Sequence, residues 1–315
     1  MSVRHPSAKL LVRAGLVALL ALMSACGDDG TTEAVDETET EQSGGTGETP
    51  DLPTLPDDTD PDIAVFEDFS GATFSNPTVI DNQYLPFLPG NRLVLSGVTV
   101  DEGEELDHQI RYVVTDLTKE ILGVETVVVW IEDYSDDELV EVEIAFYAQD
   151  DSGNVWFFGE HPEEYEDEEL IDAPTWIAGV EGAYPGIVMY ADPQTGGSPY
   201  FQGWGPSVEW SDFARVESVD EEICVEMDCF ASSITIAESS LEEEDIFQLK
   251  MYAPGVGNIK VDFRGDDETQ EQLEVVDHGS ISDSDLAEFN ALAKALEASA
   301  YDVSADVYGE TTPME

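Results

Sequence analysis

The sequence predicts a mainly β protein: an antiparallel sheet, curved into a half-barrel or closed into a barrel, with one amphipathic helix near the C-terminus. Short runs rich in Val, Ile, Tyr and Trp follow one another between residues 91 and 278, with acidic or glycine-containing turns between them. No helical pattern separates these runs, which argues against βαβ units and a parallel sheet. A helical pattern begins only after residue 281.

The expected strands are recognised by β-branched and aromatic residues between turn formers. They cover residues 91–100, 108–115, 124–132, 139–149, 213–219, 223–237, 246–252, 257–263 and 272–278. Polar and apolar residues alternate at 108–113 and again at 140–144. This period of two predicts a sheet with one solvated face.

A hairpin is clearest at residues 145–160, where two aromatic runs flank Asp150-Asp151-Ser152-Gly153-Asn154. Gly153 can adopt the positive φ of a tight turn. Trp156 and Phe158 share strand parity, so they should lie on one face. Between residues 160 and 207, prolines and glycines predict long ordered loops with short strands.

The helix is predicted near residues 284–299. Ser282-Asp283-Ser284-Asp285 offers an N-cap and acidic residues for its start. Leu286, Phe289, Leu292, Ala293 and Leu296 then follow at helical spacing. We expect a β-rich domain at 63–280, the helix packed on it within 281–300, and a tail at 301–315.

The N-terminus has the three parts of a secretory signal peptide, which we place at residues 1–25. Basic residues come first, an apolar run follows, and Met23-Ser24-Ala25-Cys26 closes the segment. These four residues resemble the lipobox of bacterial lipoproteins, in which the cysteine is diacylated and becomes N-terminal. Two acyl chains give stable membrane residence. The alternative is a plain secretory signal with a chance cysteine at position 26.

Residues 26–62 are rich in Asp, Glu, Thr, Gly and Pro and poor in large apolar residues. Such a segment cannot bury enough surface to fold, so we expect a disordered, acidic, lipid-anchored tether. Gly27, rather than an aspartate, follows Cys26. By the enteric retention rule this favours the outer membrane or the cell surface for an exported, anchored protein.

The net charge is extreme: 71 Asp and Glu stand against 11 Lys and Arg, a formal charge of −60. Such a surface repels phosphate backbones and excludes nucleic-acid binding through a basic footprint. The acids are spread over the whole chain, which favours solubility and adaptation to salt. Recognition of cations or of a basic partner is the alternative.

Three cysteines are present, and lipid on Cys26 leaves Cys224 and Cys229 as one pair. Disulfides persist in exported proteins. Residues five apart on one continuous strand point to opposite faces, so this disulfide requires a turn within 225–228. A metal site is the alternative, but no histidine lies nearby and the spacing is unusual for zinc.

Several segments, in order, resemble landmarks of a family of secreted bacterial proteins of unknown function. The first, NQYLPFLPG at 82–90, resembles the family's DNPYFPLxPG opening. The others are LGVETVVV at 122–129, YAQD at 147–150 with GNVWFFGE at 153–160, PGIVM at 185–189 and YAPGVG at 252–257. The resemblance covers about residues 82–260 and implies export and a β-rich fold, but no activity. The cysteine pair and the aromatic segment 200–210 depart from the pattern.

No catalytic residues can be assigned from motifs. The sequence contains neither a G-x-S-x-G elbow nor an H-E-x-x-H zinc pair. Beyond the signal peptide the histidines are His108, His161 and His278, and each is better explained as an exposed or hydrogen-bonded residue. We expect no cofactor and assign no metal ligands.

Calcium is the one ion considered, because acidic residues alternate at Asp58, Asp60 and Asp62 and at Asp133, Ser135 and Asp137. Neither set continues as an EF-hand loop, with its glycine and distal glutamate. Solvated acids of a linker and a turn are the favoured interpretation.

The most ligand-like segment contains Tyr200, Phe201, Trp204 and Trp210 among glycines. Aromatic residues on such loops can line a pocket for a small apolar ligand or a sugar. A loop that folds back to cap the sheet is the alternative.

Three hypotheses for function follow. The leading one is a non-enzymatic, lipid-anchored envelope or surface protein whose concave β-domain binds a ligand or partner. The second is an envelope hydrolase whose histidine, carboxylate and serine meet only in the fold. The third is a structural acidic surface protein without a pocket.

Overall fold

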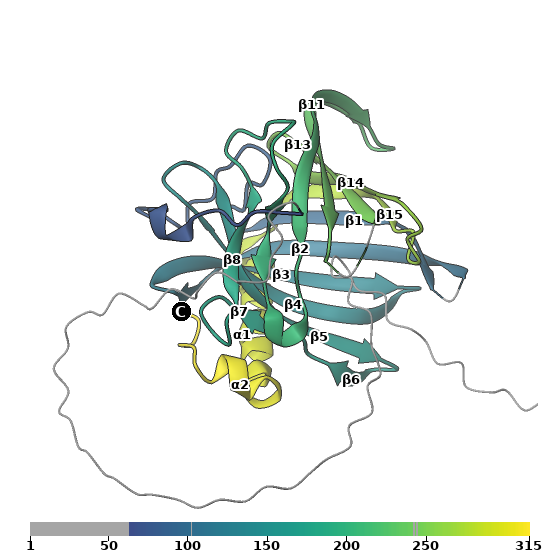
Figure 1. Cartoon of the computed structure of the whole chain (residues 1–315). Coiled ribbons are helices and arrows are strands. Elements are labelled where there is room, and N and C mark those ends of the chain that lie inside the picture. The colour runs from purple at the N-terminus through teal and green to yellow at the C-terminus, as the bar shows by residue number, and fades with distance from the viewer. Residues whose placement is uncertain (1–62, 102, 242, 244) are drawn as a thin grey trace, which may run out of the picture.

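The computed structural model describes residues 63–315, apart from residues 102, 242 and 244 (Figure 1). The expected signal peptide, Cys26 and the tether lie outside the described residues, as do Asp58, Asp60 and Asp62. The strands are β1 (Asn91–Asp101), β2 (Glu104–Ile121), β3 (Val124–Ser135), β4 (Glu138–Gln149), β5 (Val155–Glu166), β6 (Glu169–Asp172), β7 (Trp176–Ile177), β8 (Tyr184–Met189), β9 (Tyr200–Phe201), β10 (Gly203–Trp204), β11 (Phe213–Cys224), β12 (Cys229–Ser239), β13 (Phe247–Ala253), β14 (Gly257–Arg264) and β15 (Gln272–Ser280). The helices are η1 (Phe69–Gly71), η2 (Pro206–Val208), α1 (Asp283–Val303) and α2 (Ala305–Tyr308).

The strands form one antiparallel sheet that is nearly closed into a barrel, which confirms the predicted fold class. Its order is β10-β8-β5-β4-β3-β2-β1-β15-β14-β13-β12-β11-β9, with β6 and β7 also paired to β5. The two ends of this path, β9 and β10, are separated in the chain only by Gln202. We call the region where the two ends of the path meet the seam. The backbones lie close together there, since a Cβ on Gly186 of β8 would lie 2.4 Å from the Phe201 carbonyl oxygen.

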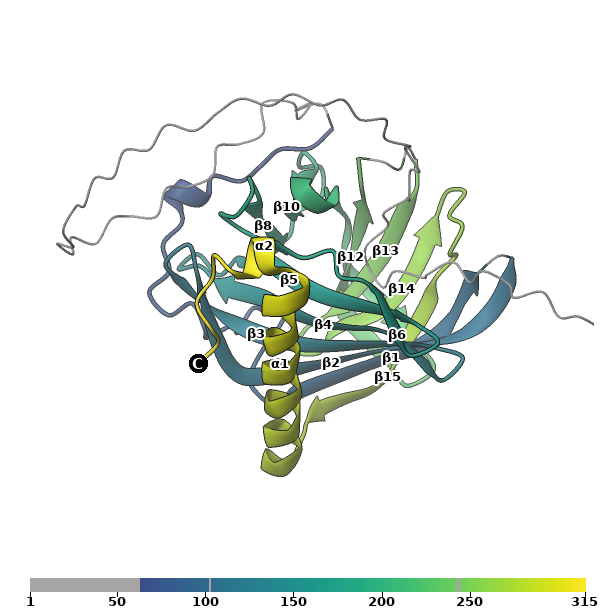
Figure 2. The same cartoon turned by 90° about the horizontal axis from the view of Figure 1, so that it is seen from below.

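Helix α1 packs on the outer face of the sheet, across β2 to β5 (Figure 2). Its first turn is capped by Ser282, whose hydroxyl accepts a hydrogen bond from the Asp285 amide at 3.2 Å. Ala293, Leu296 and Ala300 pack against outward-facing side chains of the strands. Within the described residues, no helix is both long and apolar enough to cross a membrane.

A second apolar cluster fills the inside of the curved sheet. It combines alternate residues of facing strands, among them Ile110, Val129, Ala145, Ile236 and Val261. The sheet is therefore covered on both sides over β2 to β5: by the helix outside and by the opposite strands inside.

This arrangement corrects the expectation of a solvated face at residues 140–144. Val142 and Ile144 point outward beneath α1, as alternation requires. Glu141 and Glu143 point the other way, but each is only 6 % exposed. The alternation is correct, yet the polar side faces the interior, because the sheet curves until its opposite strands exclude bulk solvent.

The predicted hairpin is present between β4 and β5, and Asp150 organises its turn. The Asp150 carboxylate accepts hydrogen bonds from the amides of Ser152 at 2.8 Å and Asn154 at 2.9 Å. It also accepts the Trp156 indole N–H at 2.9 Å. Trp156 and Phe158 lie together in the outer cluster, so one acidic residue connects the turn to the packing of the strand.

Cys224 and Cys229 form a disulfide, with Cα atoms 4.0 Å apart. They stand opposite each other where β11 ends and β12 begins. The turn expected between them is present, and the Val225 amide donates to the Asp228 carbonyl at 3.0 Å. The disulfide therefore joins β11 and β12 next to the turn of their hairpin.

Candidate functional site

A cavity of about 250 Å³ lies inside the curved sheet. Aromatic and aliphatic side chains form much of its wall: Leu93, Tyr112, Val114, Ile131, Tyr147, Phe157, Val188, Trp210, Tyr252 and Val256. The lining includes the exposed residues Gly255, His278 and Gly279 as well as the buried residues Glu143 and Glu160. The cavity therefore leads from the surface to a polar interior, with a volume near the lower end of small-molecule pockets, ~300 Å³.

Besides Arg92 and His278, four carboxyl groups and one lysine line this cavity and come from separate parts of the sheet. Glu143 comes from β4, Glu160 from β5, Glu238 from β12 and Lys250 from β13, while Asp212 directly precedes β11. Each shares the inward side of its strand with residues of the interior cluster. The sheet thus gathers four carboxyl groups and one ammonium group from positions up to about a hundred residues apart.

Lys250 is committed to Glu238. Its Nζ lies 2.6 Å from Oε2 of Glu238, and the other oxygen of this carboxylate accepts the Gln202 side-chain amide at 3.0 Å. Burial opposes the charged form of Lys250, but the adjacent Glu238 outweighs it and raises the pKa of Lys250 well above its usual range. The two residues therefore form an ion pair at neutral pH.

Glu143 and Asp212 have the opposite electrostatic setting. Burial, reinforced by nearby Glu141, raises the pKa of Glu143 to about 8. Burial, with the charge of Glu238 as the next cause, raises the pKa of Asp212 well above its usual range. Glu143 is therefore largely protonated at neutral pH, and the charged form of Asp212 is disfavoured. A protonated carboxyl group can donate as well as accept a hydrogen bond.

Of the four aromatic residues proposed from sequence, only Trp210 is among the residues that line this cavity. Tyr200 belongs to the interior cluster and packs edge-on against Tyr190. Phe201 stacks on Phe66 with ring centroids 4.3 Å apart, and Trp204 meets the same ring edge-on. The aromatic segment thus builds the seam of the sheet and contributes Trp210 to the cavity.

Among the described residues, three buried donors at or near the cavity have no hydrogen-bond partner. They are the indole N–H of Trp210, whose side chain stacks on Trp176 at 4.6 Å, the hydroxyl of Tyr200 and the Nε of Arg92. Tyr200 lies close enough to Glu238 for that charge to raise the pKa of its hydroxyl, although burial is the larger cause. Unpartnered buried donors are rare in folded proteins and mark places where a partner is missing.

A second polar cluster is sealed within the sheet. The His108 ring lies between Asp133, at 3.5 Å from its Nδ1, and Glu271, at 3.0 Å from its Nε2. Ser135 Oγ lies 3.4 Å from the same Nδ1. Burial raises the pKa of Asp133 to about 7, and the two carboxylates raise the pKa of His108 despite its burial.

This cluster combines the residue types of a hydrolase, but Ser135 is 8 % exposed and His108 2 % exposed. Neither of them lines the cavity. Asp133 and Ser135 of the calcium hypothesis lie here, whereas Asp137 lies exposed in the β3–β4 turn. Across the described ranges, no three His, Cys, Asp or Glu residues are grouped to hold a metal ion.

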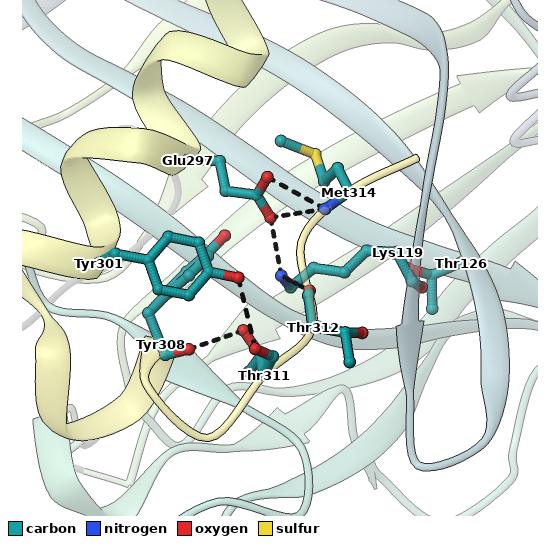
Figure 3. A network of polar contacts seen from close by, with 8 residues as sticks. All are labelled: Lys119, Thr126, Glu297, Tyr301, Tyr308, Thr311, Thr312 and Met314. Atoms are coloured by element: carbon teal, nitrogen blue, oxygen red, sulfur yellow. Dashed lines mark hydrogen bonds and ion pairs between the residues drawn. The ribbon is translucent and has the colours of Figure 1, made fainter.

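A third buried charge lies on the outer face, between β2, α1 and the C-terminal segment (Figure 3). Lys119 Nζ lies 2.8 Å from Glu297 Oε1 and donates to the Thr312 carbonyl at 2.6 Å. Both oxygens of Glu297 accept the Met314 amide at 3.0 Å. The ring of Tyr308 covers the ammonium group, 4.6 Å away. Nearby, the backbone of Glu315 pairs with Thr118.

Comparisons with known proteins add little. No family model matches the chain, and no curated protein matches it. One matching solved structure is provisionally described as an exported protein with a YmcC-like fold from Bacteroides fragilis. It shares 12 % identity, covers 63 % of this chain and all of its own, and has a TM-score of 0.35. At that score the likeness supports no conclusion about fold or function.

Sequence reasoning missed the four carboxyl groups and the lysine of the cavity. Glu143 belongs to an alternating run that also fits a solvated face, and Glu160 stands where irregular loops were expected to begin. Lys250 gave the only usable signal, since it is one of few basic residues and stands within an expected strand. A lone lysine among strand residues in an acidic chain indicates a buried carboxylate partner, but not which one.

Proposed function

We propose that this protein is an exported, lipid-anchored envelope protein that binds a small molecule inside its curved sheet and does not transform it. The observation that carries the proposal is the cavity, which combines an apolar and aromatic wall with a few convergent polar groups. This combination is typical of small-molecule sites. A purely structural surface protein has no need of such a cavity.

Binding is favoured over catalysis by the separation of the polar clusters. The residues that resemble a hydrolase site surround His108, where Ser135 is buried and neither residue lines the cavity. The cavity that has an open end contains carboxyl groups, Lys250 and aromatic rings, without an activated nucleophile. The cavity that a ligand can enter and the serine that could act as a nucleophile therefore lie in different parts of the protein.

Native mass spectrometry of the full chain purified from its own host tests the proposal. We expect a small molecule to travel with the protein. Val256→Trp should exclude it, because this partly buried residue lines the cavity beside its exposed end. Val276→Trp is the matched control, since Val276 is 50 % exposed and does not line the cavity. Wild-type protein that is empty under every gentle condition would refute the proposal.

The anchor is tested separately. Cys26→Ser removes the residue that carries the lipid in the proposed lipoprotein, so the protein should move from the membrane fraction to the soluble fraction. Cys224→Ser alters a cysteine that forms a disulfide in the structure and should leave the membrane fraction unchanged. Retention of the Cys26→Ser protein in the membrane would exclude the lipid anchor.

A further inference from the structure

We infer that the ligand is a small amphiphilic amine, whose cationic head binds among the carboxyl groups that include Asp212 and Glu143 and whose apolar part lies against the aromatic wall. This inference rests on the proposed function and names the class of ligand for the same cavity. It follows from three features: the balance of charge in the cavity, the rings that surround it, and a Trp210 donor without a partner among the described residues.

The cavity has an excess of carboxyl groups over cations. Asp212 is surrounded by Glu160, Glu238 and Glu243, and Lys250 is the positive charge that acts on it. Lys250 is itself held by Glu238 at 2.6 Å. A further cation would therefore enter an environment with more carboxyl groups than cations, where a carboxyl group that ionises can pair with it.

Glu143 adds to this excess. It is flanked by Glu141 and hydrogen-bonded to Glu160, again with Lys250 as the positive charge that acts on it. Without a ligand, burial raises the pKa of both Glu143 and Asp212 and so favours their protonated forms. When an ammonium ion binds, one of these acids can ionise to form an ion pair, and its proton passes to the solvent.

The aromatic rings suit the rest of such a molecule. Tyr112, Tyr147, Phe157, Trp210 and Tyr252 line the cavity, and ring faces attract cations as well as apolar groups. The unpartnered indole N–H of Trp210 can donate to a polar atom of the ligand. An anion is disfavoured by the excess of carboxyl groups, because Asp277 already pairs with the Arg92 guanidinium, although the Arg92 Nε has no partner among the described residues.

Calorimetry of the full chain with three matched probes tests the inference. The probes are 2-phenylethylamine, 2-phenylethanol and 3-phenylpropanoate, which share a ring and differ in charge. We expect the amine to bind at least tenfold more tightly than the alcohol, and the carboxylate to bind most weakly. Heats measured in phosphate and in Tris at pH 7 should show release of about one proton with the amine alone, as expected when a protonated carboxyl group pairs with a cation.

Asp212→Asn should reduce the preference for amine over alcohol by tenfold or more and reduce proton release. If this variant fails to fold, Glu143→Gln provides the same comparison from the other carboxyl group. The matched control is Glu120→Gln, an exposed residue of β2 away from the cavity, which should leave both affinities unchanged.

The two hypotheses fail in different ways. If the alcohol binds as tightly as the amine, or if Asp212→Asn and Glu143→Gln leave the preference intact, the inference is overturned while the cavity remains a binding site. If no probe binds and the protein from its host is empty, the proposed function fails with it.

Discussion

Buried acids on the two faces of this sheet are held in opposite protonation states. Outside, contacts from His161, Ser299 and Tyr165 outweigh burial and lower the pKa of Glu163 to about 2. Inside, burial and neighbouring acids raise the pKa of Glu143 to about 8. Burial opposes ionisation in both places, so the difference comes from the partners that the fold supplies.

The comparison separates structural charge from charge that is available to a ligand. Glu297, also outside, receives Lys119 and the Met314 amide, so its oxygens are satisfied by the chain itself (Figure 3). Inside, burial disfavours the charged forms of Glu143 and Asp212, and both residues line the cavity. Loss of one partner of the outer ion pair should therefore destabilise the protein. The acids inside should lower its stability, and we expect their role to be in binding.

The largest effect is expected on the outer face. Lys119→Met should lower the free energy of unfolding by ~3–5 kcal/mol, because it leaves the Glu297 carboxylate buried without its cation. Urea unfolding monitored by circular dichroism measures the change. Lys294→Met is the control. Lys294 is exposed on α1, the helix that contains Glu297, so this substitution should change stability by less than ~0.5 kcal/mol.

A double variant tests the cause. Lys119→Met with Glu297→Leu removes both charges and should recover much of the lost stability, because apolar residues of similar volume often replace a buried ion pair without cost. If Lys119→Met alone costs less than ~1 kcal/mol, the charge beneath α1 is not structural and the contrast between the two faces fails.

Inside the sheet, removal of an acid should increase stability. The unfolded Glu143 ionises near pH 4.5, but the folded one keeps its proton until about pH 8. The folded state therefore binds the extra proton between these values, and its stability falls as the pH rises through that window. Glu143→Gln removes this cost and should stabilise the protein by on the order of 2–3 kcal/mol at pH 8.

Glu143→Gln should have little effect at pH 5, because the folded state then needs little free energy to keep Glu143 protonated. Urea midpoints at pH 5 and pH 8 give the comparison. Glu138→Gln, at the exposed start of the same strand, should behave like wild type at both values. A Glu143→Gln protein that is less stable than wild type at pH 8 would place Glu143 among the structural charges.

The His108 cluster should give the protein a further dependence on pH, of about 2 kcal/mol. The pKa of Asp133 is raised from 3.8 to about 7, so its contribution to stability falls as the pH rises between these values. The pKa of His108 is also raised, so its stabilisation is full below about pH 6.5 and lost above. Both residues thus favour the folded state under acidic conditions.

Asp133→Asn should flatten this dependence between pH 5 and pH 8, since the variant has no carboxyl to ionise beside the ring. Unfolding midpoints at four pH values measure the slope. Asp137→Asn, in the exposed turn after β3, should keep the wild-type slope. An unchanged slope in Asp133→Asn would show that the acid is ionised throughout this range.

The fold was more predictable than the site for a physical reason. Strand periodicity and turn chemistry are local, so the β4–β5 hairpin and the cap at Ser282 follow from adjacent residues. Closure of the sheet is not local. Closure determines whether Glu143 faces water or the interior. The alternating valines and glutamates of its strand fit either outcome.

The cavity residues illustrate the same limit. Asp212 and Lys250 are 38 positions apart along the printed sequence, and they meet because β11, β12 and β13 pair in order. Sequence composition could indicate that Lys250 needs an acidic partner. It could not choose among 71 acids, because that choice depends on register and curvature.

The smallest effect is expected far from both faces, at the disulfide that ends the β11–β12 hairpin. Replacement of Cys224 and Cys229 by serine should lower the free energy of unfolding by about 1–2 kcal/mol, because closure of so short a loop removes little chain entropy. Affinity for the amine probe should be unchanged, since neither residue lines the cavity. Urea unfolding and calorimetry of the same protein measure both quantities. A loss of affinity would show that this hairpin positions Glu238, further along β12, and would extend the binding region beyond the cavity wall.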